Sequence, residues 1–241
     1  MIRTCIPLCC NDKQCEFVNK LLIKRPVVIP YENILNNVFT HYFVGYILIR
    51  ILLDIEIIID INNIILLFTG IILGFISADI FSYIIHVFID SKLWRKINNV
   101  EKKGRCIVNM HHDYTMIYSY LNSTELVCTT YPIVVPYVII SSFYKLTHPV
   151  LIGFNISFIV FGITTAHSHK WAHERLHNIP LNIIICKLQD IGLLLNPKSH
   201  QKHHIVENDE NRENFSLSSG ISEKYMNVFL SKIMNIRLNL H

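Results

Sequence analysis

Histidine is the residue type whose number and spacing best suit chemistry in this sequence, which contains 13 histidines. His169 and His173 are four residues apart, and His200, His203 and His204 follow the spacing i, i+3 and i+4. On a helix, residues at these spacings share a face with Cβ atoms about 5–6 Å apart, which suits the binding of one metal ion. The spacing therefore predicts a metal centre formed by imidazoles.

Three further histidines, one single and two adjacent, extend the predicted centre. The candidate ligands fall into four groups along the chain, which is enough for two metal ions. They are His86, His111, His112, His169, His173, His200, His203 and His204. Zinc, copper, iron and nickel all accept imidazole ligands, so the histidines by themselves do not identify the metal.

Carboxylates close to these histidines are candidates for a supporting role, because such groups commonly orient a ligating imidazole by accepting its second ring N–H. Asp79 lies inside an apolar stretch, where a carboxylate is costly and is therefore a functional candidate. The predicted supporting residues are Asp79, Asp90, Asp113, Glu174 and Asp190. No catalytic residue is predicted beyond the metal ligands.

The elements that must position these residues are apolar helices. With 51% hydrophobic and 17% charged residues, the chain is too apolar for an ordinary soluble fold. The run 63–88 is long enough to cross a hydrocarbon core of roughly 30 Å as a helix. Further spans are expected at 42–60, 126–143 and 150–166, the last two forming a helical hairpin. The predicted fold is an all-α integral membrane bundle with about four transmembrane helices.

The distribution of Lys and Arg predicts the orientation of this bundle, since cytosolic loops carry an excess of basic residues. These residues concentrate in the N-terminal arm, after the 63–88 span and after the 150–166 span. Both termini and the histidine cluster are therefore expected on the cytosolic side. We expect residues 1–38 to form a cytosolic arm and residues 39–241 a multi-pass domain in the endoplasmic reticulum membrane. The segment 180–195 is expected to be an interfacial helix that closes the site.

Several motifs, in a fixed order, resemble one known family. They are Ala78-Asp79 with Tyr83 through His86, Met110-His111-His112-Asp113, His169-Lys170-Trp171-Ala172-His173, Leu188-Gln189-Asp190 and His200-Gln201-Lys202-His203-His204. Together they resemble the Kua family of lipid desaturases, which includes plasmanylethanolamine desaturase. The resemblance covers roughly residues 74–220.

The resemblance implies a lipid desaturase domain that binds two non-haem iron ions through the eight histidines named above. It implies desaturation of the alkyl chain of an ether phospholipid next to the ether oxygen, which gives the vinyl ether of a plasmalogen. Oxygen would be the co-substrate and a cytochrome b5-type protein the electron donor, with no nucleic acid as a partner. A plant branch of the family instead desaturates the acyl chain of phosphatidylglycerol, and the motifs do not separate the two branches.

Other classes remain as alternatives to a desaturase. A zinc membrane hydrolase needs fewer ligands and typically a Glu base in HExxH, a motif that the sequence lacks. A haem-binding electron carrier uses single axial histidines on facing helices rather than close pairs. A non-catalytic membrane scaffold would be distinguished from an enzyme only by metal content or activity.

Overall fold

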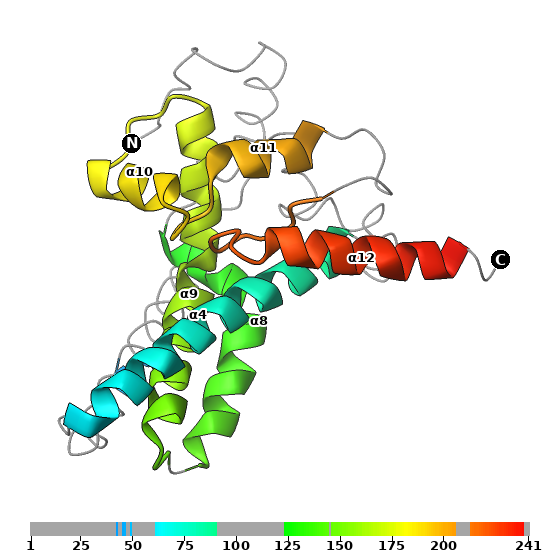
Figure 1. Ribbon diagram of the computed structural model, residues 1–241. Coiled ribbons are helices and arrows are strands. Elements are labelled where there is room, and N and C mark those ends of the chain that lie inside the picture. The colour runs from blue at the N-terminus through cyan, green and yellow to red at the C-terminus, as the bar shows by residue number, and fades with distance from the viewer. Residues whose placement is uncertain are drawn as a thin grey trace, which may run out of the picture.

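Within its described residues, the computed structural model is built from helices (Figure 1). It describes residues 42, 45, 46, 49, 61–90, 123–144, 146–205 and 213–238. The helices are α4 (Ile61–Asp90), α8 (Ser123–Ser142), α9 (Pro149–Leu176), α10 (Ile183–Asp190), α11 (Pro197–Ile205) and α12 (Glu223–Leu238). The predicted all-α class is confirmed for this part of the chain.

Helix α9 lies at the centre of the arrangement and contacts α4, α8, α10 and α11. Helix α9 packs against both α4 and α8, and in Figure 1 α10 and α11 lie towards the C-terminal end of α9. Helix α12 crosses near the C-terminal end of α4, which it contacts. The apolar helices thus occupy one part of the molecule and the short helices gather at one end.

Two helices are long and apolar enough to cross a membrane, Asn63–Asp90 in α4 and Pro149–Leu176 in α9. Only 28% of the most apolar 18-residue stretch of α4 is buried, whereas the core helix of a soluble protein is mostly buried. Large apolar side chains such as Ile65, Phe68 and Ile72 are exposed on this helix. Such a surface is stable in lipid rather than in water.

The predicted hairpin is present, because α8 and α9 pack together and are joined by a short connection. Pro149 occupies the first turn of α9, and the side chain of His148 caps the helix by accepting a hydrogen bond from the N–H of Val150 at 3.3 Å. Val138 of α8 and Ile159 of α9 are buried against each other in the core between the two helices. Whether α8 spans the bilayer stays a prediction. The expected span 42–60 lies mostly outside the described residues.

Helix α9 is longer than the predicted span 150–166 and continues to Leu176. Its 28 residues correspond to about 42 Å of helix, whereas a hydrocarbon core is about 30 Å thick. The last turns of α9, which contain His169 and His173, therefore extend beyond the length that a span requires. The helix thus continues through both histidines, which is the condition for their imidazoles to share one face.

Glycines allow α4 and α9 to approach each other closely. Gly70 and Gly74 have the small-xxx-small spacing that permits backbone contact between helices in membranes. A Cβ atom at Gly70 would lie 2.1 Å from the carbonyl oxygen of Val150, and one at Gly153 would lie 2.3 Å from that of Leu67. Neither position has room for a larger residue, so these glycines set the distance between the two helices.

We predict that Gly70→Ala destabilises the protein by about 1–3 kcal/mol, because the added methyl group must push the backbone of α9 away. The loss is measurable as a lower midpoint of thermal unfolding in detergent, followed by circular dichroism. Gly162→Ala is the matched control, because its Cβ would lie 3.2 Å from a Val134 methyl group that can move. Equal midpoints for the two variants would show that the glycine contact does not limit the approach of the helices.

Candidate metal centre

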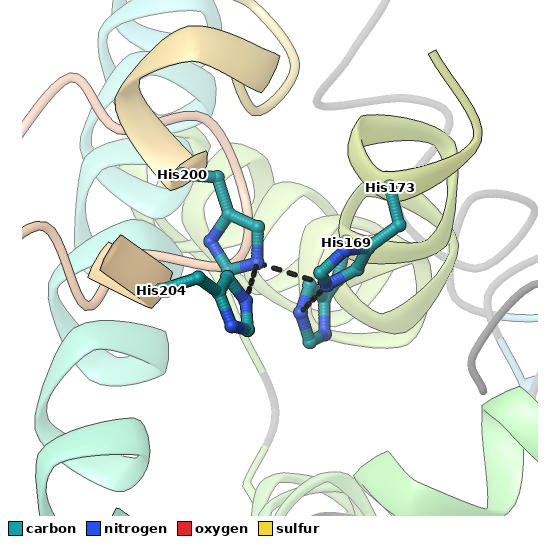
Figure 2. A group of neighbouring side chains, drawn as sticks. All are labelled: His169, His173, His200 and His204. Atoms are coloured by element: carbon teal, nitrogen blue, oxygen red, sulfur yellow. Dashed lines mark hydrogen bonds between the residues drawn. The ribbon is translucent and has the colours of Figure 1, made fainter. Parts of the chain in front are cut away.

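Four imidazoles from two helices converge at the end of the bundle (Figure 2). His169 and His173 are on α9, and His200 and His204 are on α11. Their Nε2 atoms form a chain of contacts, 2.9 Å from His169 to His173, 3.1 Å from His173 to His200 and 2.9 Å from His200 to His204. We call these residues the four-histidine group.

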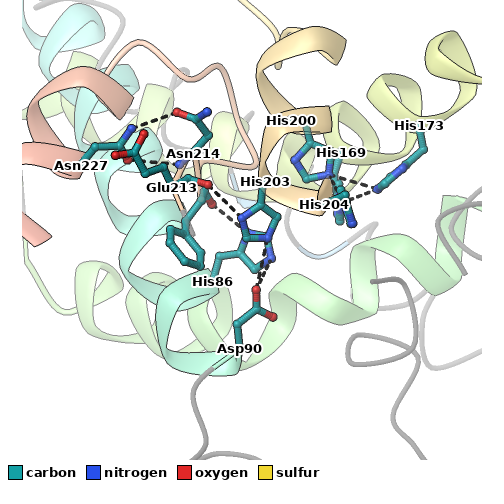
Figure 3. A network of polar contacts seen from close by, with 11 residues as sticks. His86, Asp90, His169, His173, His200, His203, His204, Glu213, Asn214 and Asn227 are labelled. Atoms are coloured by element: carbon teal, nitrogen blue, oxygen red, sulfur yellow. Dashed lines mark hydrogen bonds and ion pairs between the residues drawn. The ribbon is translucent and has the colours of Figure 1, made fainter. Parts of the chain in front are cut away.

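A second group of ligand-type side chains lies beside the first (Figure 3). His86 and Asp90 are on α4 and His203 is on α11. The Oδ2 atom of Asp90 is 3.3 Å from Nε2 of His86 and 3.2 Å from Nε2 of His203. We call these residues the three-residue group. The rings of His203 and His204, one from each group, have centroids 5.3 Å apart, so the groups are neighbours.

The start of α11 is fixed by its local sequence. The side-chain oxygen of Asn196 accepts hydrogen bonds from the N–H groups of Lys198 and Ser199, at 3.0 and 3.3 Å, as an N-cap residue does. Pro197 follows at the first helical position, where its missing N–H costs nothing. The capping sets where the helix begins and therefore the directions in which its histidines point.

Backbone carbonyl groups orient the histidines of the three-residue group. The Nδ1 atom of His86 is 2.8 Å from the carbonyl oxygen of Phe215, and that of His203 is 3.0 Å from the carbonyl oxygen of Glu213. A carbonyl oxygen only accepts hydrogen bonds, so each Nδ1 carries the proton and donates it. In a neutral ring the lone pair is then on Nε2, which is the atom that faces Asp90.

Burial keeps His200 and His203 of α11 neutral. Desolvation lowers the pKa of His200 well below its ordinary value, and the neighbouring histidines lower this pKa further. Desolvation is the main cause and the nearby His86 a further cause that together lower the pKa of His203 to about 4, although Asp90 raises this pKa. Neutral imidazoles are the form that binds metal ions, so this environment prepares the side chains for ligation.

The donor atoms of both groups fit a metal ion. Two nitrogens bound to one ion at about 2.1 Å and at a right angle would lie about 3 Å apart, close to the separations in the four-histidine group. In the three-residue group, the lone pairs of His86 and His203 meet a carboxylate oxygen, an arrangement that a cation between them stabilises. Within each group, all candidate donor atoms lie within 4.8 Å of one another.

Six of the eight predicted histidine ligands thus come together, in two neighbouring groups. His111, His112 and the supporting candidate Asp113 lie outside the described residues, and their roles stay predictions. Asp90, which we expected to support His86 from outside the metal site, instead lies between His86 and His203 as a candidate ligand. Its spacing of four residues from His86 is the same signal that identified His169 and His173.

The other predicted supporting carboxylates have different partners. Asp79 is fully buried, and its hydrogen bonds are to residues 216–222 rather than to any histidine. Glu174 forms an ion pair with Lys170 at 3.7 Å. Asp190 is exposed at the end of α10 and pairs with Arg175 at 2.8 Å. Arg175 also donates to the buried Gln189 at 3.3 Å, which ties α10 to α9.

The profile of the lipid desaturase domain family matches residues 75–234 of this chain. The match covers more than half of the sequence and includes every residue of both groups. The chain therefore belongs to the lipid desaturase family, a class of membrane oxidoreductases. Comparisons with curated proteins and with solved structures gave no match.

A buried glutamate next to α11 should make the stability of the protein depend on pH. Glu223 begins α12, lies close to the αL residue Gly220 and accepts a hydrogen bond from the hydroxyl of Ser199. Desolvation raises the pKa of Glu223 from 4.5 to about 7, and the charge of Asp79 also raises it. The folded state therefore holds a proton on Glu223 that the unfolded state releases at lower pH.

We predict that stability falls as the pH rises from about 4.5 to about 7, because the folded state resists ionisation of Glu223. Glu223→Gln is neutral throughout, so its stability relative to the wild type should rise over this window by up to about 3 kcal/mol. Unfolding midpoints in detergent, measured across this pH range, test the expectation. Ser199→Ala should widen the loss, since its hydroxyl lowers the pKa of Glu223. If the unfolding midpoints of wild type and Glu223→Gln change with pH in parallel, Glu223 does not cause the loss of stability.

Proposed function

We propose that this protein is a di-iron, oxygen-dependent desaturase that converts the alkyl ether chain of an ether phospholipid to a vinyl ether. The observation that carries the proposal is the pair of neighbouring donor groups, both of which take ligands from α11. Membership of the lipid desaturase family supports the reaction class. The motif resemblance to the Kua family favours the plasmanylethanolamine type of substrate.

The composition of the three-residue group favours iron over other metals. Two histidines and one carboxylate form the ligand set of many non-haem Fe(II) enzymes that use oxygen. Zinc hydrolases typically hold one ion with three protein ligands, whereas here seven side chains form two adjacent groups. The donor set therefore argues against the zinc hydrolase alternative.

When bound, the metal ions supply the oxidising power that removes hydrogen from an unactivated carbon chain. Overall, two C–H bonds of the chain break and one C=C bond forms, while O₂ is reduced to two molecules of water. The lipid chain contributes two of the four electrons and two of the four protons; a cytochrome b5-type donor contributes the other two electrons, and the solvent contributes the other two protons. The protein's own part is to hold the donor atoms and to exclude water, which burial of His173, His200 and His203 supports.

The lipid has an apolar route to this site along the bundle. Both groups lie towards the C-terminal ends of α4 and α9, whose exposed apolar surfaces suit a bilayer. A phospholipid beside these helices would place the first carbons of its chain near the donor groups. The opposite face of α11 exposes Lys198, Gln201 and Lys202. We propose this basic face as the contact surface for the electron donor, on the cytosolic side of the proposed endoplasmic reticulum topology. Desaturation of a phosphatidylglycerol acyl chain is the alternative outcome for the same site.

We predict that the protein purified in mild detergent contains two iron ions per chain and no stoichiometric zinc. His203→Ala should lose the ion of the three-residue group, and His204→Ala the ion of the four-histidine group. Plasma mass spectrometry measures both metals. His167→Ala is the control that should keep both ions, since its half-buried ring lies against Trp171 outside both groups. One zinc per chain, or no metal, would exclude a di-iron enzyme.

We further predict that cells making the protein and supplied with alkyl ether phospholipid accumulate vinyl ether lipids, detected by mass spectrometry and by acid lability. Replacing Asp90, a candidate ligand, should reduce this product by about 100-fold or more, because loss of even an outer partner of a metal ligand typically costs about 10- to 100-fold in activity. Iron content should fall from the wild type to Asp90→Glu and further to Asp90→Asn, as the carboxylate is first displaced and then neutralised. A new double bond in acyl chains, without vinyl ethers, would select the phosphatidylglycerol alternative.

A further inference from the structure

The carboxylate of Asp79 is enclosed by one segment of the chain. Its Oδ1 atom accepts hydrogen bonds from the N–H groups of Ser219 and Gly220, at 2.7 and 3.0 Å, and from the hydroxyl of Ser216. Its Oδ2 atom accepts from the N–H of Ser222 at 2.9 Å and from the hydroxyl of the same residue at 2.6 Å. These donors compensate a carboxylate that is fully buried in a membrane helix.

Backbone N–H groups point at both oxygens, so the site requires a group that only accepts. Gly220 has φ +84°, a left-handed conformation that lets successive N–H groups turn towards one anion. The carboxylate also lies next to the first turn of α12, where the helix dipole favours negative charge. An amide in place of this carboxylate would turn an N–H group towards at least one of these backbone donors.

The same segment supplies the two carbonyl groups that orient the three-residue group. We call residues 213–222 the carbonyl loop, because Glu213 accepts from His203 and Phe215 from His86. Between these two residues, Asn214 adopts the left-handed φ of 61°, which Asn tolerates better than most residues. The orientation of both imidazoles therefore depends on the position of this loop.

The carbonyl loop is anchored at both ends. At its N-terminal end, Asn214 and Asn227 exchange hydrogen bonds, and the Oδ1 atom of Asn227 also accepts from the hydroxyl of Tyr83 at 2.8 Å. At its C-terminal end, the anchor is Asp79, through its hydrogen bonds to the loop. Ser168 donates to the carbonyl of Ser218 at 2.6 Å and so adds a tie to α9. Asp79 is the anchor with the most hydrogen bonds and the only charged one among the described contacts.

We propose that Asp79 is a positioning residue for the three-residue group: by holding the carbonyl loop, it sets the affinity of His86, Asp90 and His203 for their metal ion. The effect is selective, because the two loop carbonyls bond histidines of this group. The inference rests on the proposed metal centre, and its first part, the tie between Asp79 and the loop, is measurable without metal.

The test compares wild type with Asp79→Asn in two steps. In metal-free protein, hydrogen–deuterium exchange reports the N–H groups of Ser219, Gly220 and Ser222, which should lose protection in the variant. Titration with Fe(II) or Co(II) then gives the affinity of each group. Loss of an outer partner of a metal ligand typically weakens binding about 10- to 100-fold, and we expect this loss for one of the two ions only.

Ser157→Ala is the matched control for a lost buried contact between segments. Its hydroxyl donates to the carbonyl of Ile71 at 2.8 Å and joins α9 to α4 away from the carbonyl loop. This variant should leave both affinities and the exchange of residues 219–222 unchanged. If Asp79→Asn does not fold, Ser222→Ala removes one hydroxyl donor and keeps the backbone N–H. Ser222→Ala should weaken binding of the ion in the three-residue group by a smaller factor than Asp79→Asn does.

The outcomes separate the inference from the proposed function. If the wild type binds two ions and Asp79→Asn binds each of them with the wild-type affinity, the positioning role is overturned and the di-iron proposal stays intact. Equally weaker binding of both ions would also overturn the positioning role, because a general structural defect acts on both groups. If the wild type binds no ion, the di-iron proposal is wrong. If hydrogen–deuterium exchange of residues 219–222 is the same in metal-free wild type and Asp79→Asn, Asp79 does not hold the carbonyl loop.

Discussion

The position of α11 between α9 and α4 is the constraint on which the rest of the site depends. Within nine residues, this helix provides His200 and His204 to one group and His203 to the other. Neighbouring positions on a helix point in different directions, so α11 serves both groups only if each side faces a different long helix. The Asn196 cap and the hydrogen bond from the N–H of Leu195 to Ser168 hold it there.

Close packing of the long helices makes this arrangement possible. In lipid there is little hydrophobic drive for helices to associate, so direct backbone contact at Gly70 and Gly153 stabilises the pair. The contact is reinforced further along by the rings of Phe75 and Phe161, whose centroids are 4.5 Å apart. The apolar part of the molecule thereby fixes the distance between His86 on α4 and the histidines on α9.

A second requirement is that buried polar groups have partners where water is excluded. Serines 216, 218, 219 and 222 and the carboxylate of Asp79 meet this requirement near the three-residue group. The carbonyl loop connects this polar network to the imidazoles, so the ligands, their carbonyl partners and the anchors of the loop form successive layers. Metal sites in proteins depend on such outer layers for the orientation of their ligands.

The sequence by itself determined the features that depend on local helical geometry and composition. Apolar runs predicted α4, α8 and α9, and the four-residue spacings predicted that His169 would face His173 and His200 would face His204. The same spacing between His86 and Asp90 was available as a signal for a ligand, although we assigned Asp90 a supporting role. The tertiary structure decided that His203 pairs with α4 rather than α9, and that Asp79 binds the carbonyl loop. Both contacts join residues more than 100 positions apart, so no local spacing reveals them. Backbone N–H groups bind both oxygens of Asp79, and these groups are the same in every residue and leave no pattern in the sequence.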